Sequence, residues 1–169
     1  MNKLLQKIFK LKKPILKDAE EVLSAISDVV FNSSLDIYRH IYTLPNSDKT
    51  GYEEENITRM KNVRESIRLI IKYEGDVNSF SEEEKEIYLP LMQEGAIYYD
   101  DLVRVLVEHH DDISEANHLF EIHPELHNYI PKQYDNSRQV IEVLIEYIRN
   151  YQWLLERFVN KYFSESEAN

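Results

Sequence analysis

Large apolar residues recur every three or four positions along the carboxyl-terminal part of the chain. They are Ile141, Leu144, Ile148, Tyr151, Leu155, Phe158 and Tyr162. This spacing follows the 3.6-residue turn of an α-helix and places all seven side chains on one face. Asp135 or Asn136 supplies the short polar side chain that suits a helix N-cap. The pattern therefore predicts a long helix that buries this face and leaves Arg149 and Glu156 in solvent.

The same periodicity predicts a long helix over residues 18–44. Pro14 ends the segment before it, and Asp18 is the expected N-cap. Residues 32–34 read Asn-Ser-Ser, and these are weak helix formers because their side chains compete for backbone hydrogen bonds. We expect them to bend or interrupt the helix.

Local signals predict two further helices. Apolar spacing indicates one over residues 56–74, with Gly75 in the left-handed conformation just past its end. Ser81 and Glu84 match the S-x-x-E capping box, which marks the start of the next helix. Because Pro90 cannot donate a backbone hydrogen bond, this third helix is expected to be kinked near Tyr88 or split, with its main segment over residues 91–112.

The composition agrees with a helical fold. Only 3 of the 169 residues are glycine and 5 are proline, which disfavours turn-rich β-sandwiches. With 43% hydrophobic residues, the chain has enough apolar surface for a core. We expect an all-α, single-domain bundle of four or five mainly antiparallel helices over residues 14–163, followed by a frayed tail at 164–169.

Residues 1–13 differ from the rest of the chain in charge. Their lysines are Lys3, Lys7, Lys10, Lys12 and Lys13, and they contain no acidic residue. Leu4, Ile8 and Leu11 fall on one helical face, which predicts a short basic amphipathic helix. We expect this helix to dock on the acidic body of the same protein. The alternative is weak, reversible contact with an anionic membrane surface.

The body of the chain is strongly acidic. The overall formal charge is −11, and residues 1–17 contribute +6, so the other 152 residues carry −17. Because the phosphates of nucleic acid would be repelled, we expect no direct nucleic-acid binding by the body. We predict a basic protein partner, with a neutral ligand as the alternative. The alternative is that the charge only keeps the protein soluble.

Three absences bear on the cellular location. No apolar run reaches the ~20 residues of a membrane-spanning helix, and the first residues lack the pattern of a signal peptide. The chain also has no cysteine, which agrees with a reducing compartment. We therefore expect a soluble protein of the cytoplasm.

Tyrosine is abundant, with 12 residues, and several tyrosines fall outside the apolar stripes. Combined with neighbouring acids, they give a candidate binding set: Tyr52, Glu53, Tyr73, Glu74, Tyr88, Tyr98 and Asp100. Tyr129 and Tyr134 lie in connecting segments. Tyrosine is enriched at binding surfaces, so we expect a mixed aromatic and acidic face that suits a basic partner. The alternative is tyrosines at helix boundaries, packed by their rings.

Five of the six histidines lie within residues 109–127, together with several carboxylates. The candidate metal ligands are His109, His110, His118 and His123, since imidazole and carboxylate groups bind zinc or iron. Pro124 places the start of a helix after His123, and no H-E-x-x-H pattern is present. We therefore expect structural histidines and no metal or other cofactor, with a His/carboxylate metal-binding bundle as the alternative.

Arg104 and His109 form an R-x4-H motif within the six residues RVLVEH. This motif resembles that of HEPN-domain ribonucleases, helical bundles whose paired Arg and His cluster at a dimer interface and cleave RNA without metal. The resemblance implies catalytic roles for Arg104 and His109. On a regular helix the two side chains would point about 140° apart. The alternative for Arg104 is pairing with Asp101 or Glu108 on a solvated face.

The sequence contains no glycine-rich phosphate loop and no G-x-S-x-G nucleophile motif. The leading prediction is therefore a non-catalytic acidic helical module that binds a protein. An immunity or inhibitor protein that neutralises a basic enzyme or nucleic-acid-binding protein would fit this description. The metal-independent ribonuclease and the metal-binding bundle are the alternatives, and the sequence does not indicate an oligomeric state.

Overall fold

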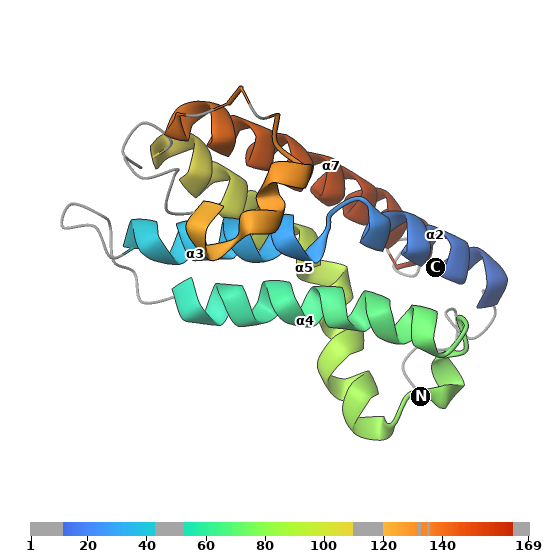
Figure 1. The fold of residues 1–169 in the computed structure, drawn as a ribbon. Coiled ribbons are helices and arrows are strands. Elements are labelled where there is room, and N and C mark those ends of the chain that lie inside the picture. The colour runs from blue at the N-terminus through green and yellow to red at the C-terminus, as the bar shows by residue number, and fades with distance from the viewer. Residues whose placement is uncertain (1–11, 43–52, 110–119, 132, 135, 164–169) are drawn as a thin grey trace.

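A computed structural model describes residues 12–42, 53–109, 120–131, 133–134 and 136–163. The main helices are α2 (Lys12–Ser24), α3 (Asp28–Tyr42), α4 (Glu53–Lys72), α5 (Glu82–His109) and α7 (Ser137–Tyr162), with short 3-10 helices η1 (Val77–Ser79) and η2 (Pro124–Asn128). Every regular element in these residues is helical, and the helices form a bundle (Figure 1). The predicted all-α fold class is confirmed.

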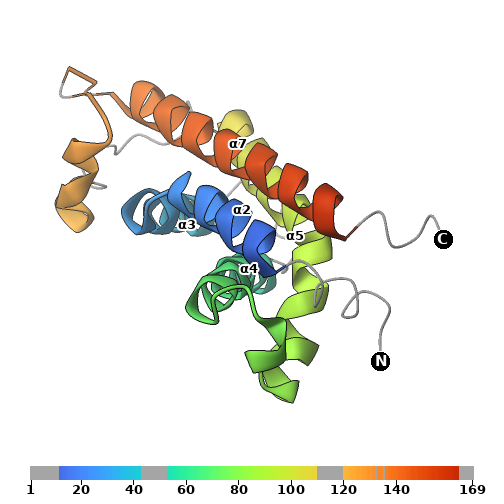
Figure 2. The ribbon, with the colours of Figure 1, turned by 90° about the vertical axis from the view of Figure 1, so that its right-hand side faces the viewer.

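The helices share one apolar core. Helix α5 packs against both α4 and α7, and α2 lies between α4 and α7 (Figure 2). Tyr38, Tyr99 and Tyr151 are fully buried, and the Tyr99 and Tyr151 rings meet edge to face with their centroids 4.8 Å apart. Several tyrosines therefore serve the core rather than the surface.

Helix α7 agrees with its sequence pattern. Asn136 is the N-cap, and its side chain accepts a hydrogen bond from the backbone N–H of Gln139 at 3.0 Å. All seven residues of the predicted inward stripe are buried, and Ile148 and Leu155 have no exposed surface. The start and the rotational phase of this helix are confirmed.

The break in the first helical region lies earlier than predicted. Residues 25–27 separate α2 from α3, and the Ser27 hydroxyl accepts a hydrogen bond from the backbone N–H of Val30. The predicted interruption at residues 32–34 is wrong, because this stretch lies inside α3. Ser33 and Ser34 are buried and donate their hydroxyls to backbone carbonyls four residues earlier, which satisfies them within the helix.

Helix α2 begins before the predicted boundary. It starts at Lys12, so Pro14 lies in its first turn, where a missing N–H costs nothing. The predictions that Pro14 ends a helix and that Asp18 is an N-cap are therefore wrong. Asp18 lies inside α2 and accepts hydrogen bonds from Tyr162 and Lys161 of α7. Most of the predicted amphipathic helix falls on residues 1–11, which lie outside the described residues. The predicted tail at 164–169 also lies outside them.

Helix α4 ends in two residues with positive φ. Glu74 has φ 53° and Gly75 has φ 79°. The Gly75 N–H donates to the carbonyl of Ile70 at 2.8 Å, and the Glu74 N–H donates to that of Ile71 at 3.0 Å. This pair of bonds is a Schellman motif. It confirms the left-handed Gly75 and adds Glu74, which the sequence pattern did not indicate.

The start of α5 has the predicted capping box. The Glu84 N–H donates to the Ser81 hydroxyl at 3.0 Å, and the Ser81 N–H donates to the Glu84 carboxylate at 2.9 Å. Helix α5 continues through Pro90, so it is not split. Its first turns lie at an angle to the rest of the helix (Figure 1). Helix α5 therefore has the predicted kink, and its first turns point in a different direction from the rest of the helix.

Candidate functional site

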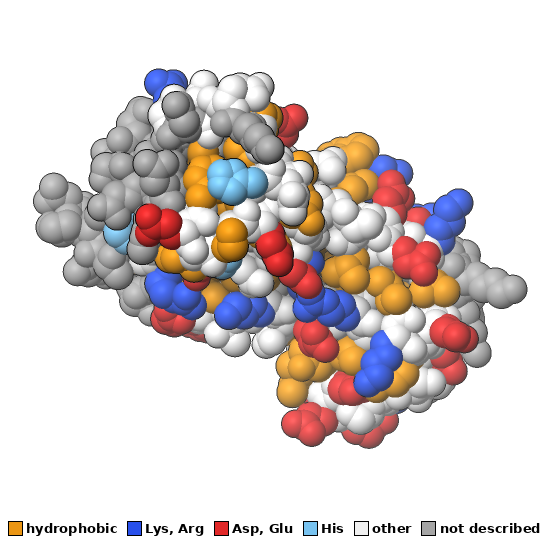
Figure 3. Space-filling view, viewed as in Figure 1, with side chains coloured by type: hydrophobic (Ala, Val, Ile, Leu, Met, Phe, Trp, Pro, Cys, Tyr) orange, Lys and Arg blue, Asp and Glu red, His pale blue; other side chains and the backbone are white. Residues whose placement is uncertain are grey.

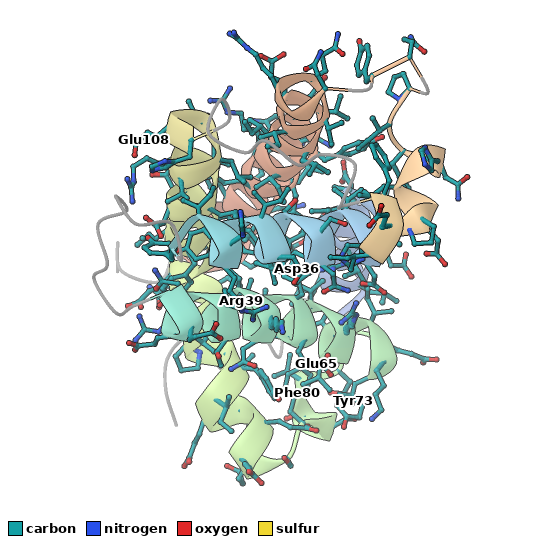
Figure 4. The ribbon with its side chains drawn as sticks, turned by 60° about the vertical axis from the view of Figure 1, so that its left-hand side comes forward. Asp36, Arg39, Glu65, Tyr73, Phe80 and Glu108 are labelled. Atoms are coloured by element: carbon teal, nitrogen blue, oxygen red, sulfur yellow. The ribbon has the colours of Figure 1, made fainter. Side chains whose placement is uncertain are left out.

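The predicted tyrosine and acid set is distributed over several places. Tyr73 packs on Phe80 with the ring centroids 5.3 Å apart, and its hydroxyl donates to Glu84 at 3.2 Å (Figure 4). This half-buried ring closes the turn between α4 and α5. Glu74 beside it is exposed. Tyr73 therefore packs by its ring at the end of a helix, as in the alternative given for the tyrosines above.

Tyr98 lies near the other end of α4. The Arg59 guanidinium lies 5.3 Å from the centre of the Tyr98 ring, and the Tyr98 hydroxyl donates to Glu94 at 3.4 Å. Burial raises the pKa of Tyr98 above its ordinary value. Arg59 and Tyr73 are 14 residues apart in sequence, or about 20 Å along a helix. Tyr73 and Tyr98 therefore do not form one compact patch.

The remaining members of the set have separate surroundings. Tyr88 is half-buried and packs against the core, and Asp100 is exposed and accepts a hydrogen bond from Gln152 at 3.3 Å. Glu53 is the first residue of α4. Tyr52 lies outside the described residues.

One face of α5 combines acidic side chains with exposed apolar ones. We call it the α5 outer face, and it consists of Glu83, Glu86, Ile87, Pro90, Glu94 and Ile97, all exposed. Their spacing of three and four residues places them on one side of the helix. Ile97 is 67% exposed and Ile87 is 42% exposed, which is high for such large apolar side chains. The sequence reasoning did not single out these two isoleucines.

The α5 outer face lies in the most acidic stretch of the helix. Residues 82–101 contain seven Asp and Glu residues and one lysine, Lys85, which pairs with Glu82 at 2.9 Å. Within the described part of the chain, no Lys or Arg forms an ion pair with Glu83 or Glu86. Figure 3 shows acidic side chains gathered over the lower part of the molecule, where the first turns of α5 lie. These carboxylates are therefore available to a cationic partner.

A second surface is an aromatic groove between the segment after η2 and helix α7. Tyr129, Pro131, Tyr134, Val143 and Tyr147 line it, together with Glu146 and Asn150. The Tyr147 hydroxyl donates to the Tyr129 carbonyl at 3.3 Å, and the two rings meet edge to face. Sequence reasoning placed two of these tyrosines in connectors but missed Tyr147. Its position off the inward stripe of α7 is the signal that could have found it.

A buried arginine was also missed. Arg64 is 3% exposed, and its guanidinium lies 4.4 Å from the centre of the Phe31 ring. It pairs with Asp28 at 3.0 Å and donates to the carbonyl of Ile26 at 3.1 Å. These bonds tie α4 to the turn between α2 and α3. Because the guanidinium is used in this way, Arg64 serves the fold.

The R-x4-H motif occupies the end of α5. Arg104 pairs with Asp101 at 2.6 Å and with Glu108 at 3.1 Å. The hydrogen bond to Asp101 raises the pKa of Arg104. His109 is the last residue of the helix and is half-buried. The contacts of Arg104 are those expected for a solvated helix face, and the ribonuclease activity stays a prediction.

The histidine-rich stretch is only partly described. His123 Nε2 lies 2.7 Å from the carboxylate of Asp36, which joins the segment before η2 to α3. Pro124 begins η2, so the predicted helix start after His123 is confirmed. His110 and His118 lie outside the described residues. Among the residues that are described, no group of three or more His, Asp or Glu side chains could hold a metal ion.

Comparison of the chain with known protein families, with curated proteins and with solved structures found no match. None of the described helices combines the length and hydropathy that crossing a membrane requires. The α5 outer face and the aromatic groove are the candidate binding surfaces of the described residues.

Proposed function

We propose that this chain is a non-catalytic, cytoplasmic protein-binding module whose α5 outer face binds a basic protein. The observation that carries the proposal is the exposure of Ile87 and Ile97 between carboxylates, of which Glu83 and Glu86 have no cationic partner in the described residues. A basic enzyme or nucleic-acid-binding protein fits this chemistry, and an immunity or inhibitor protein is the corresponding class.

Each part of the face has a separate physical role. Fully burying an exposed isoleucine contributes about 1.5–3 kcal/mol. Because Ile97 is 67% and Ile87 42% exposed, the two side chains together would contribute roughly this amount on binding. The surrounding carboxylates would attract a cationic surface from a distance and orient it during association. They would also repel nucleic acid, so the module would bind a nucleic-acid-binding protein and not the nucleic acid itself.

A charge-reversal experiment tests this proposal. The full chain, the variant Glu83→Lys/Glu86→Lys and the control Glu20→Lys/Glu156→Lys are used to retain proteins from a lysate of the native host. Glu20 and Glu156 are exposed on α2 and α7, so both variants change the net charge equally. We expect the wild type and the control to retain one or more basic proteins. The Glu83→Lys/Glu86→Lys variant should not retain them.

The salt dependence of retention provides a second criterion. Attraction between exposed charges is screened at high ionic strength, so retention should fall as salt is added. Retained proteins that are acidic, or retention that the α5 variant preserves, would contradict the proposal.

A further inference from the structure

We propose that residues 1–11 of the same chain occupy the α5 outer face when no partner is bound. The inference rests on the proposed function for its consequence, which is competition between this segment and the basic partner. The docking itself requires only the two parts of this chain, so it can be tested without any partner.

The two parts are complementary in charge and in apolar character. Residues 1–11 contain Lys3, Lys7 and Lys10 and no acidic residue. Leu4, Ile8 and Leu11 share one helical face, and the three lysines lie along one side of it. The α5 outer face offers the converse arrangement: Ile87 and Pro90 lie between Glu86 and Glu94, and the exposed Ile97 follows Glu94.

The apolar stripe of residues 1–11 is shorter than the α5 outer face. Ile87 and Ile97 are ten residues apart, or about 15 Å along α5. Leu4 and Leu11 are seven residues apart, or about 10 Å in a helix. The stripe can therefore cover Pro90 and one of the two isoleucines at a time.

The fold places the start of α2, to which residues 1–11 are attached, at the end of the molecule where α5 begins. Helix α2 begins at Lys12, so residues 1–11 continue from that point. Figure 1 shows the start of α2 at the same end of the bundle as the end of α4 and the start of α5. A helix over residues 4–11 is about 12 Å long, so it would dock on the part of the α5 outer face that lies nearest to the start of α2.

Docking would reduce the apparent affinity for a partner. A tethered segment competes at an effective concentration in the millimolar range, and the partner binds only the fraction of molecules whose face is open. Displacing the segment would then be part of recognition. This arrangement would favour partners that bind more strongly than the lysine-rich segment.

The absence of cysteine allows a clean test on the full chain. A nitroxide label is attached at Gln6→Cys, which lies opposite the Leu4 and Ile8 stripe on a helix, and broadening of backbone amide signals is measured by NMR. We expect strong broadening in residues 83–97, and little in the first half of α7. Uniformly weak broadening, or broadening centred on another surface, would overturn the proposal.

Matched variants separate specific docking from general attraction. Glu83→Lys/Glu86→Lys should remove the broadening, and Glu20→Lys/Glu156→Lys should preserve it. If both variants remove it equally, the segment is attracted by net charge alone and the proposal fails. Amide signals of an unlabelled, isotope-enriched chain mixed with the spin-labelled chain should remain sharp, because broadening there would assign the face to a second copy.

The results distinguish this inference from the proposed function. Broadening at residues 83–97 supports docking even if no basic protein is retained from the lysate. Retention of a basic partner by the α5 outer face without such broadening supports the proposed function and overturns the docking. Flotation of the chain with anionic vesicles, with no broadening in their absence, would assign residues 1–11 to a membrane and also overturn it.

Discussion

The buried hydroxyl of Tyr38 in α3 donates a hydrogen bond to the carboxylate of Asp101 in α5. Asn56 of α4 donates to the same carboxylate at 3.3 Å, and Arg104 binds its other oxygen at 2.6 Å. Burial, together with the hydrogen bond to Asp101, raises the pKa of Tyr38 far above its ordinary value. One carboxylate therefore joins three helices through polar contacts.

Removing the Tyr38 hydroxyl should destabilise the protein. We expect Tyr38→Phe to lower the free energy of unfolding by about 1–3 kcal/mol, because Asp101 loses a donor in a partly buried place. Urea denaturation followed by circular dichroism measures this change. Tyr98→Phe is the control, since its hydroxyl forms one long bond to exposed Glu94, and it should change stability by less than about 0.5 kcal/mol. Equal effects would show that the Asp101 contact contributes nothing specific.

The phase of α7 can be tested with two matched pairs. Ile148→Ala and Leu155→Ala should each lower the unfolding free energy by about 2–5 kcal/mol, because both side chains are fully buried. Arg149→Ala and Glu156→Ala replace the next residue in each case and are exposed. They should cost less than about 0.5 kcal/mol in the same chemical denaturation. Comparable losses in both pairs would contradict the orientation of this helix.

Gly95 allows α5 to approach α4 closely. A Cβ atom at this position would lie 2.9 Å and 3.0 Å from the two methyl carbons of Val63, which is stiff because it is β-branched. Overpacking of this kind costs about 1–3 kcal/mol, whereas the gain in helix propensity from Gly to Ala is at most about 1 kcal/mol. We therefore expect Gly95→Ala to lower the melting temperature.

The double variant Val63→Ala/Gly95→Ala tests the cause of that change. Truncating Val63 removes the clash, so the double variant should be less destabilised than the sum of the two single variants. Simple additivity would show that the close contact is not responsible.

Asp18 should make stability depend on pH in the acid range. Desolvation tends to raise its pKa, but hydrogen bonds from Tyr162 and Lys161 outweigh this effect, and the pKa lies below the ordinary 3.8. A lowered pKa in the folded state stabilises the protein above the unfolded pKa, and this contribution is lost as the pH falls through the folded value.

The Asp18→Asn variant lacks this contribution at every pH. We therefore expect the difference in unfolding free energy between wild type and variant to be largest at neutral pH and to shrink below about pH 4. Urea denaturation over this pH range measures it. Tyr162→Phe removes one donor to Asp18 and should reduce the same pH dependence in part. A difference that stays constant with pH would contradict the assignment.

Local sequence patterns were sufficient to predict those features that depend only on residues close together in the chain. The apolar stripe of α7, its Asn136 cap, the capping box of Ser81 and Glu84, and the left-handed Gly75 all follow from contacts within about five positions. The all-α class followed from the same signals together with the low glycine content.

Other features depend on which segments meet in space, and the tertiary structure alone decided them. The helix breaks at residues 25–27 and not at 32–34, because Arg64 of α4 binds the carbonyl of Ile26 while α3 buries Ser33 and Ser34.

The surfaces were decided in the same way. Exposure of Ile87 and Ile97 depends on which face of α5 the neighbouring helices cover, and the contact of His123 with Asp36 joins residues 87 positions apart. Helical periodicity specifies which residues share a face. The packing of the other helices specifies whether that face is buried or exposed, because burial depends on contacts that sequence spacing does not encode.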